Sequence, residues 1–197
     1  MGIVDYGAGN QASLVHAFRD LGFLPLTTTD PGLLAATDVI VLPGVGAFPS
    51  AMDHLQSHGL VTFLRTWNES DRPLIGICLG MQLMGESSEE MGETLGLGVI
   101  PGRTVPLRGD QWNIGWDELE ATTGVAPSFD HSGDYYFNHS FEFLGPDEFL
   151  VAVSRESAPI QAVVRKGNAV GIQFHPEKSQ ESGRRLLSQL VGELIGG

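Results

Sequence analysis

Apolar residues along the first half of this chain alternate between two spacings. Short continuous apolar runs are typical of buried strands, and they occur at residues 2–6, 23–27, 38–42 and 73–75. Between these runs the apolar residues recur at helical spacing, which predicts helices that end at Gly22, that span residues 49–67, and that continue from Cys78 to about Glu90. This alternation predicts a parallel sheet with right-handed crossovers and a functional site at the carboxyl edge of its strands.

The second half of the chain is richer in strands. The same patterns predict strands at residues 99–107, 115–121, 135–143, 149–154, 160–165 and 169–174. A hairpin turn is predicted at residues 166–168, and a final helix at residues 180–195. Because we find no linker-like segment and no internal repeat, we predict one domain over residues 1–197. Its expected fold class is α/β, with a central, mostly parallel sheet flanked by helices and with antiparallel strands added in the second half.

Composition narrows the classes of protein to which the chain can belong. Its 42% hydrophobic and 18% charged residues are typical of a water-soluble globular protein. The net charge of −13 argues against nucleic acid or an anionic membrane as a partner, since both bind basic surfaces. The single cysteine excludes an internal disulfide and a cysteine-cluster metal site, and we expect no metal or cofactor. Without a signal-peptide pattern or an apolar run of membrane-spanning length, the expected location is the cytoplasm.

The single cysteine lies in the segment Gly76–Gly80, between a predicted strand and a predicted helix. A sharp strand-to-helix turn with glycines two residues on either side of one nucleophilic residue has the features of a nucleophile elbow. Such a turn exposes the sulfur at the carboxyl end of the sheet, where the positive end of the helix dipole favours a thiolate. The alternative interpretation is that Cys78 is a small apolar residue of the core.

Two further glycine-containing segments follow predicted strands. The loop at residues 43–48 carries two glycines at the end of a central strand, so it either presents backbone N–H groups to an anion or is a plain turn into the next helix. The glycine pair at residues 7–9 resembles half of a dinucleotide-binding fingerprint. Because the third glycine and the later acidic residue are out of register, we interpret this second segment as a strand-to-helix turn.

A histidine and a carboxylate stand together after the last predicted strand. Residues two apart in an extended segment project to the same side, so His175 and Glu177 can lie together across the rigid Pro176. A carboxylate fixes the tautomer of an imidazole, and an imidazole beside a cysteine can accept the thiol proton and later supply one to a leaving group. The alternative is a polar turn in which Ser179 caps the final helix.

Together with the elbow, this segment gives the chain a resemblance to a known family. Residues 76–82 and 174–179 resemble the two motifs of the triad-type, class I glutamine amidotransferases. Residues 5–10, 43–48 and 136–140 are similar to one branch of that family, the glutaminase subunits of imidazole glycerol phosphate synthases. The resemblance extends from the first strand to the last helix. It implies a flavodoxin-like α/β fold and the hydrolysis of L-glutamine to glutamate and ammonia.

The resemblance also implies roles for individual residues. Cys78 would be the nucleophile, His175 the acid and base, and Glu177 the group that orients His175. The oxyanion hole would be formed by backbone N–H groups, which belong to Leu79 and to Val45 or Gly46. A third group would bind the substrate and consists of Gly44, Gln82, Asn138, His139 and Ser140.

By the same resemblance, the ammonia would pass to a cyclase subunit with a (β/α)8 barrel, which makes imidazole glycerol phosphate and AICAR in histidine biosynthesis. Asn10, Trp116 and Tyr136 would lie toward that subunit in a heterodimer. The family usually reads His-Met-Gly-Trp-Asn where this chain has Asn113–Asp117, so the residues that flank the tryptophan differ. Two alternatives stay open: a glutaminase subunit of a different amidotransferase complex, and a catalytically idle regulatory subunit with the same fold.

Overall fold

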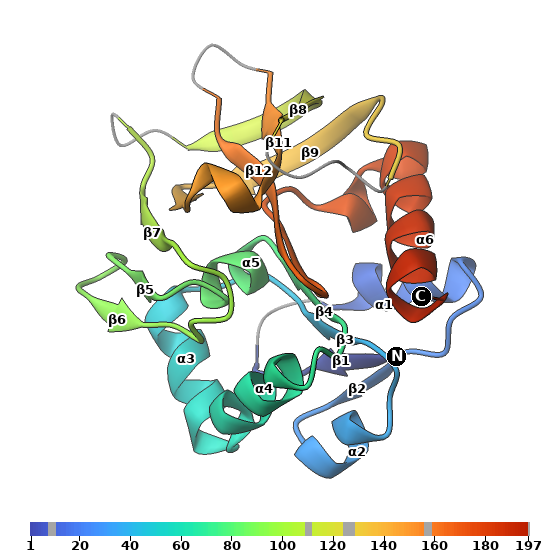
Figure 1. The fold of residues 1–197 in the computed structure, drawn as a ribbon, viewed down its shortest axis with the longest axis vertical. Coiled ribbons are helices and arrows are strands. Elements are labelled where there is room, and N and C mark those ends of the chain that lie inside the picture. Colours follow the sequence, from blue (N-terminus) through green and yellow to red (C-terminus); the bar gives the residue numbers. More distant parts are fainter. Residues whose placement is uncertain (8–10, 109–111, 124–128, 156–158, 197) are drawn as a thin grey trace.

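The computed structural model describes residues 1–7, 11–108, 112–123, 129–155 and 159–196. Its main feature is a nine-stranded sheet with the strand order β2-β1-β3-β4-β13-β12-β11-β8-β9 (Figure 1). One half of the sheet is parallel and consists of β2 (Leu26–Thr28), β1 (Gly2–Val4), β3 (Ile40–Leu42), β4 (Leu74–Ile77) and β13 (Ala169–Ile172). All of these strands except the edge strand β2 are buried along their whole length, as central strands with both faces covered should be.

The other half of the sheet continues antiparallel from β13. It consists of β12 (Gln161–Lys166), β11 (Leu150–Ser154), β8 (Asn113–Ala121) and β9 (Asp134–His139). The β12–β13 hairpin turns at Gly167, whose φ of 59° favours glycine. The structure therefore confirms the predicted α/β class, and the main sheet is mixed.

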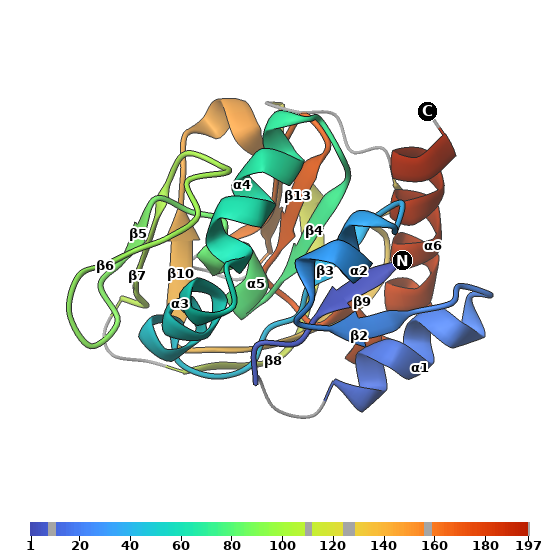
Figure 2. The same ribbon diagram turned by 90° about the horizontal axis from the view of Figure 1, so that it is seen from below.

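Helices cover both faces of this sheet (Figure 2). On one face α1 (Ala12–Asp20) and α6 (Gln180–Gly196) contribute to one hydrophobic cluster. On the other face α3 (Phe48–Ser57), α4 (Leu60–Glu69) and α5 (Leu79–Leu83) contribute to a second cluster. Among the described residues, we find no helix whose length and apolar character would let it cross a bilayer.

Three short helical segments were not indicated by the sequence patterns. In α2 (Pro31–Ala35) the Asp30 carboxylate caps the first turn by accepting two backbone N–H groups. The other two are 3₁₀ turns, η1 (Asp147–Phe149) and η2 (Pro176–Lys178), of which η2 directly follows His175.

Two helices differ from their predicted extents. The helix predicted at residues 49–67 is divided into α3 and α4, because Gly59 adopts a left-handed φ of 70° and lets the chain turn. The helix predicted from Cys78 to about Glu90 ends after α5. Its next carbonyls, on residues 83–85, accept N–H groups from residues 97–99, so they cannot continue the helical ladder.

Three strands show the largest differences from prediction. The strand predicted at residues 135–143 is divided into β9 and β10 (Phe141–Leu144), which belong to different sheets. The strand predicted at residues 99–107 contracts to β7 (Arg103–Pro106), because the N–H groups of residues 99 and 100 donate to the Met84 carbonyl. The strand predicted at residues 23–27 begins only at Leu26, since Pro25 has no N–H to donate.

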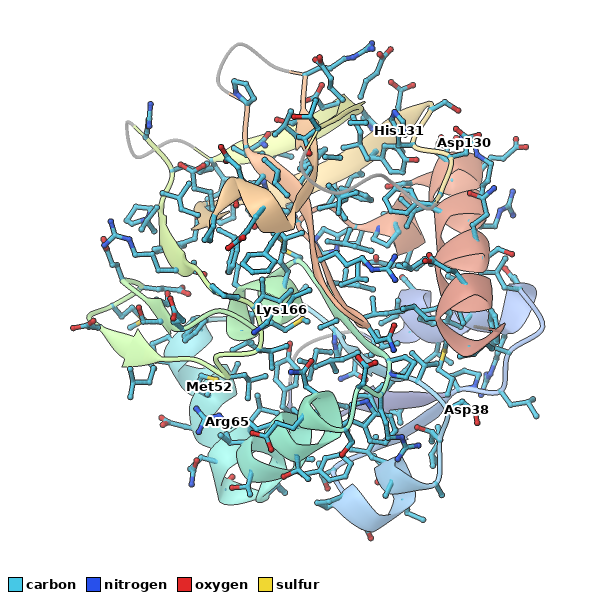
Figure 3. The ribbon with its side chains drawn as sticks, viewed as in Figure 1. Asp38, Met52, Arg65, Asp130, His131 and Lys166 are labelled. Atoms are coloured by element: carbon cyan, nitrogen blue, oxygen red, sulfur yellow. The ribbon has the colours of Figure 1, made fainter. Side chains whose placement is uncertain are left out.

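A second sheet has the strand order β10-β7-β5-β6, in which β5 is Ser87–Ser88 and β6 is Thr94–Leu95. Two cations labelled in Figure 3 fix the segment that follows β6. Arg65 of α4 donates to the Gly96 and Leu97 carbonyls at 3.0 and 2.9 Å, and Lys166 of β12 donates to the Val99 carbonyl at 3.3 Å. These bonds tie the second sheet to the main body of the molecule.

Candidate active site

Cys78 occupies the sharp turn between β4 and α5, with a φ of 51° that is unusual for a residue with a side chain. Its N–H donates to the Ile172 carbonyl at 2.6 Å, and its carbonyl accepts the N–H of Gln82 at 3.2 Å. The turn requires glycine at Gly80, where a Cβ would lie 2.1 Å from the Leu42 carbonyl oxygen. The local sequence therefore folds as a strained elbow at the carboxyl end of a central strand.

His175 follows β13, which pairs in parallel with β4 and so ends beside the elbow. Its Nδ1 lies 2.8 Å from Oε1 of Glu177, and both side chains are at least nine-tenths buried. The His175 N–H donates to the Tyr136 carbonyl at 2.8 Å, and the Ser179 hydroxyl donates to the His175 carbonyl at 2.7 Å. Backbone and side-chain contacts together hold the imidazole in one place.

The imidazole of His175 hydrogen-bonds to Glu177, and it lines the same cavity as Cys78. Burial by itself lowers the pKa of His175, but the interactions of the ring with Cys78 and Glu177 outweigh burial and raise the pKa from 6.5 to about 9. The imidazole therefore carries a proton at neutral pH, with Nδ1 on the carboxylate and Nε2 left for the sulfur. This is the arrangement of groups that nucleophilic catalysis by cysteine requires.

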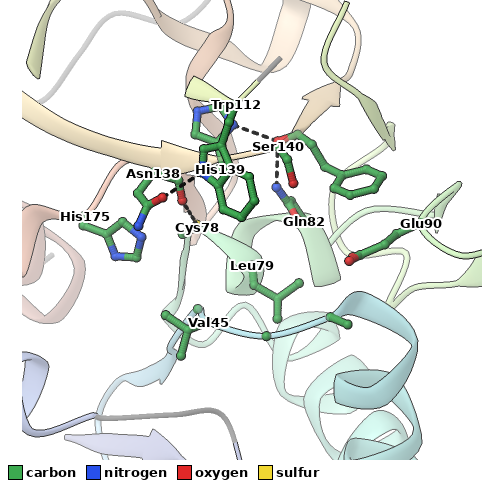
Figure 4. Close-up of a pocket in the computed structure, with 14 residues that line it drawn as sticks. Val45, Cys78, Leu79, Gln82, Glu90, Trp112, Asn138, His139, Ser140 and His175 are labelled. Carbon is green, nitrogen blue, oxygen red and sulfur yellow. Dashed lines mark hydrogen bonds between the residues drawn. The ribbon is translucent and has the colours of Figure 1, made fainter. Parts of the chain in front are cut away.

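A cavity of about 360 Å³ opens beside the sulfur (Figure 4). In that view His175 lies on one side of the cavity and Glu90 on the other. The residues that the resemblance assigned to the oxyanion hole and to the substrate all line it, namely Gly44, Val45, Gly46, Leu79, Gln82, Asn138, His139 and Ser140. Glu90 and Trp112 line it too, and the sequence patterns did not indicate either residue.

The loop after β3 touches the elbow through bare backbone. A Cβ on Gly44 would lie 1.8 Å from the Ile77 carbonyl oxygen and 2.4 Å from the Leu79 nitrogen, so only glycine fits there. Gly46 has a φ of 121°, which side chains rarely allow. Both glycines therefore serve to bring the N–H groups of this loop close to those of the elbow.

Both ends of this loop are fixed by polar contacts, of which the first is buried and the second partly buried. At the first end the Tyr6 hydroxyl donates to the Pro43 carbonyl. Burial and, to a smaller extent, the nearby Cys78 raise the pKa of Tyr6, so its hydroxyl keeps the proton that it donates. At the second end the Phe48 N–H donates to Glu90 Oε2 at 2.8 Å, where the start of α3 favours a negative charge. Sequence patterns placed Glu90 at the end of a helix. In the structure that helix ends at Leu83, and Glu90 lies instead beside the cavity.

Two buried glutamine side chains connect to the sulfur. Gln82 Nε2 donates to the Phe141 carbonyl at 3.0 Å and to Gln173 Oε1 at 3.2 Å. Gln173 Nε2 in turn lies 3.7 Å from the Cys78 sulfur, and the Asn138 carbonyl oxygen lies 4.0 Å from that sulfur. Gln173 was missed in the sequence, where the signal was a polar residue between two apolar ones at the end of β13.

His139 differs from His175 in its protonation state. Burial, assisted by the charge of the neighbouring His175 and opposed by the hydrogen bond to the Phe141 carbonyl, lowers the pKa of His139 from 6.5 to about 4. The ring is therefore neutral, with Nδ1–H donating to the Phe141 carbonyl at 2.9 Å. Its Nε2 accepts a hydrogen bond from Asn113 Nδ2 at 3.2 Å.

The residues expected at a partner surface lie on neighbouring strands. Trp116 of β8 and Tyr136 of β9 are paired in register, with ring centroids 5.6 Å apart. Trp116 is among the exposed large apolar side chains, together with Ile114 on the same strand. Asn10, the third residue of this group, lies outside the described residues. In the part of the chain that the structure describes, no group of three or more potential metal ligands is found.

Comparison with known proteins agrees with this geometry. Residues 2–192 match the family model described as Glutamine amidotransferase class-I. The chain is 40% identical over 189 residues to an "Imidazole glycerol phosphate synthase subunit HisH" of Exiguobacterium sibiricum, covering 95% of this chain and 92% of the relative. It is 39% identical over 211 residues to the protein of the same name from Shouchella clausii, covering 100% and 99%.

Solved structures show the same fold at lower sequence identity. A crystal structure titled as a glutamine amidotransferase superposes with a TM-score of 0.77 at 20% identity, covering 100% of this chain and 99% of the other. A glutamine amidotransferase from Thermotoga maritima gives a TM-score of 0.72 at 16% identity, covering 100% and 97%.

Proposed function

Since the chain belongs to the class-I glutamine amidotransferase family, we propose that it is the glutaminase subunit of an imidazole glycerol phosphate synthase in histidine biosynthesis. The observation that carries this proposal is that Cys78 and His175 line one cavity, with His175 hydrogen-bonded to Glu177 behind it. The choice of complex is supported by the relatives named for that synthase, which match this chain over nearly its whole length.

The proposed reaction passes through a covalent intermediate. The Cys78 thiolate attacks the side-chain carboxamide carbon of glutamine, and His175 gives a proton to the departing ammonia, which leaves a γ-glutamyl thioester. Water, deprotonated by the same imidazole, then attacks the thioester and releases glutamate and the thiolate. Glu177 keeps the ring oriented through both steps.

Negative charge develops on the carbonyl oxygen in each step. We expect the Leu79 N–H and an N–H from Val45 or Gly46 to meet it, because the elbow and the loop lie in contact and both line the cavity. Losing one such donor typically costs about 2.7–4 kcal/mol of transition-state stabilisation. We therefore expect the loop after β3 to be a point at which activity is controlled.

The rest of the cavity suits the amino-acid end of glutamine. The carboxylate of Glu90 lies across the cavity from His175 and presents negative charge suited to an α-ammonium group. Gly44, Gln82 and the backbone of residues 138–140 line the remaining surface, where we expect the α-carboxylate and the chain of glutamine to bind.

Release of free ammonia into solvent would waste the product, so hydrolysis should be coupled to an acceptor site on a partner. We expect that partner to be a (β/α)8-barrel cyclase in a heterodimer. By the family resemblance, its contact surface on this chain would include Trp116, Tyr136 and Asn10. The exposed apolar side chains on β8 support this face as the contact surface. We expect the assembled enzyme to work in the cytoplasm.

One observation favours a second candidate, a glutaminase subunit of a different amidotransferase complex. The segment Asn113–Asp117 differs from the family pattern on the strand that carries Trp116. Both candidates share the chemistry at Cys78 and differ in the partner. Identifying the synthase that co-purifies with this chain distinguishes them.

The central experiment measures glutamate release by the chain alone, with a purified imidazole glycerol phosphate cyclase, and with that cyclase plus an analogue of its ribulosyl substrate. We expect release to rise at each addition. Release that responds only to another synthase would favour the second candidate. A chain that releases no glutamate in any mixture, and whose Cys78 is not labelled by an electrophilic glutamine analogue, would be an idle subunit.

Replacing the nucleophile separates the two half-reactions. In the complex, Cys78→Ala should abolish glutamine hydrolysis, since no other described residue lining the cavity is a cysteine. The cyclase should still make product from ammonium salts, because the substitution leaves its own site untouched. Loss of the ammonia-dependent activity as well would indicate that Cys78 is needed for assembly of the complex.

A further inference from the structure

Trp112 stands at the mouth of the cavity, just before β8 begins. Its side chain is 64% exposed, yet it also lines the cavity beside Asn138 (Figure 4). The indole Nε1–H donates to Asn138 Oδ1 at 2.9 Å. The reaction outlined above uses the backbone of Asn138 and leaves this contact between two side chains without a role.

We propose that Trp112 is a positioning residue for glutamine: by holding the Asn138 side chain, it fixes the wall of the cavity against which the substrate binds. The inference rests on the proposed glutaminase function and adds a residue to it. Trp112 does not contact the reacting atoms, so its effect on them would be exerted through Asn138.

A second contact fixes the same wall, between the residue after Trp112 and the residue after Asn138. Asn113 is paired in register with His139, and its Nδ2 donates to His139 Nε2 at 3.2 Å. His139 passes the connection on by donating to the Phe141 carbonyl. Trp112, just before β8, and Asn113, its first residue, thus hold two consecutive residues of the cavity wall, while the Asn138 carbonyl lies 4.0 Å from the Cys78 sulfur.

Because Trp112 is exposed, its N–H does not need Asn138 as a hydrogen-bond acceptor. An indole at the surface loses nothing by donating to water, and an amide beside a cavity is free to rotate. The bond between them orders the Asn138 side chain before glutamine arrives, so the substrate does not have to supply that ordering. We therefore expect loss of the bond to weaken binding of glutamine and to leave the chemical step nearly unchanged.

The test uses the complex with its cyclase and the substitution Trp112→Phe, which keeps an aromatic ring and removes the N–H donor. We expect KM for glutamine to rise about threefold to tenfold, the range typical of one lost hydrogen bond, with kcat within about twofold of the original. Ammonia-dependent synthesis should not change. An unchanged KM would overturn the inference.

A matched control is Trp67→Phe. The Trp67 indole also donates a 2.9 Å hydrogen bond, to the Pro73 carbonyl, but it is buried in α4 and does not line the cavity. We expect this control to lower the melting temperature and to leave KM for glutamine unchanged. An equal rise of KM in both variants would mean that Trp112 acts only through general stability.

A double-mutant cycle tests whether Trp112 acts through Asn138. If it does, Trp112→Phe combined with Asn138→Ala should raise KM no further than Asn138→Ala alone, whereas multiplied effects would contradict the inference. A wild-type complex without glutaminase activity would contradict the proposed function. An active wild-type complex with an unaffected Trp112→Phe variant would contradict this inference alone.

Discussion

Two histidines in one cavity hold opposite protonation states because their neighbours differ. His175 interacts with the Glu177 carboxylate and with Cys78, and both raise its pKa to about 9 against the effect of burial. His139 is similarly buried, but its neighbours are a carbonyl and a neutral amide, and its pKa falls to about 4. One ring can therefore deliver a proton at neutral pH while the other serves as a fixed wall.

The first prediction at this scale concerns Glu177→Gln. The substitution removes a group that raises the pKa of His175, so the alkaline limb of the kcat/KM profile, expected near pH 9, should move to lower pH. We expect kcat/KM itself to fall by roughly 10²-fold or more, because the ring loses its orienting acceptor. The measurement is glutamate release by the complex from pH 6 to about pH 10.

Glu181→Gln provides the control for that experiment. It removes an equal charge from an exposed position in the first turn of α6. A Glu177→Gln profile with its alkaline limb in the original place would show that Glu177 does not set the protonation of His175.

A second prediction concerns Glu90→Gln. If the carboxylate faces the α-ammonium of glutamine, removing its charge should raise KM by about tenfold, the range of a lost hydrogen bond to a charged group, with a smaller effect on kcat. Glu89→Gln is the matched control, since Glu89 pairs with Arg103 at the surface and should leave KM unchanged. Equal KM values for the two variants would count against the role of Glu90.

At the scale of secondary-structure elements, the catalytic groups depend on the ends of strands. β3, β4 and β13 run parallel and end at one edge, so the loop at Gly44, the elbow at Cys78 and the segment at His175 meet there. Two of these strands are followed by backbone conformations that few residues allow, at Gly46 after β3 and at Cys78 after β4. The energetic cost of those backbone conformations is offset by close packing against the neighbouring strands. The packing is so close that a Cβ at Gly44 or Gly80 would collide with backbone atoms.

The prediction at this scale is that Gly80→Ala destabilises the fold by several kcal/mol. The new Cβ would lie 2.1 Å from the Leu42 carbonyl oxygen, and neither backbone can move without disturbing the sheet. Gly192→Ala is the control, because a Cβ at this helical position meets nothing within 4 Å and should stabilise α6 by about 0.5–1 kcal/mol. Urea unfolding of both variants measures the difference, and similar midpoints would contradict the prediction.

At the scale of the whole molecule, the cavity lies where two kinds of structure meet. The parallel half of the main sheet supplies Cys78 and His175, whereas β9 and the start of β10 supply the opposite wall. The short strands of the second sheet bring Glu90 to the far end of the cavity, and Arg65 and Lys166 fix the chain beyond them. Neither half of the molecule contains the complete site.

The last prediction concerns the pH dependence of folding. The pKa of His139 is about 4 in the folded chain and 6.5 in the unfolded chain, so on acidification the unfolded chain binds a proton at His139 before the folded chain does. The free energy of unfolding should therefore fall by up to about 3 kcal/mol between pH 6.5 and pH 4. His175 acts in the other direction: its raised pKa stabilises the fold fully below pH 6.5, and this contribution is lost as the pH rises through about 9.

Urea unfolding across this range should therefore show greatest stability near pH 6.5 from these two groups. His139→Gln should make the free energy of unfolding less steep on the acid side and leave the alkaline side in place. An unaltered acid slope in that variant would mean that other groups dominate the acid response.

Features that depend on residues close together in sequence could be predicted, whereas features that depend on residues far apart could not. The parallel sheet of the first half, the elbow at Cys78 and the pairing of His175 with Glu177 could be predicted from sequence. The alternation of strands and helices, the glycine and proline requirements and the two-residue period of extended chain are all local. Only the tertiary structure decided where α5 ends and where the strand predicted at residues 135–143 divides into β9 and β10. It also decided that Glu90, Trp112 and Gln173 belong to the site. There, backbone carbonyls and side chains bond to partners far along the chain, and no local pattern records those bonds.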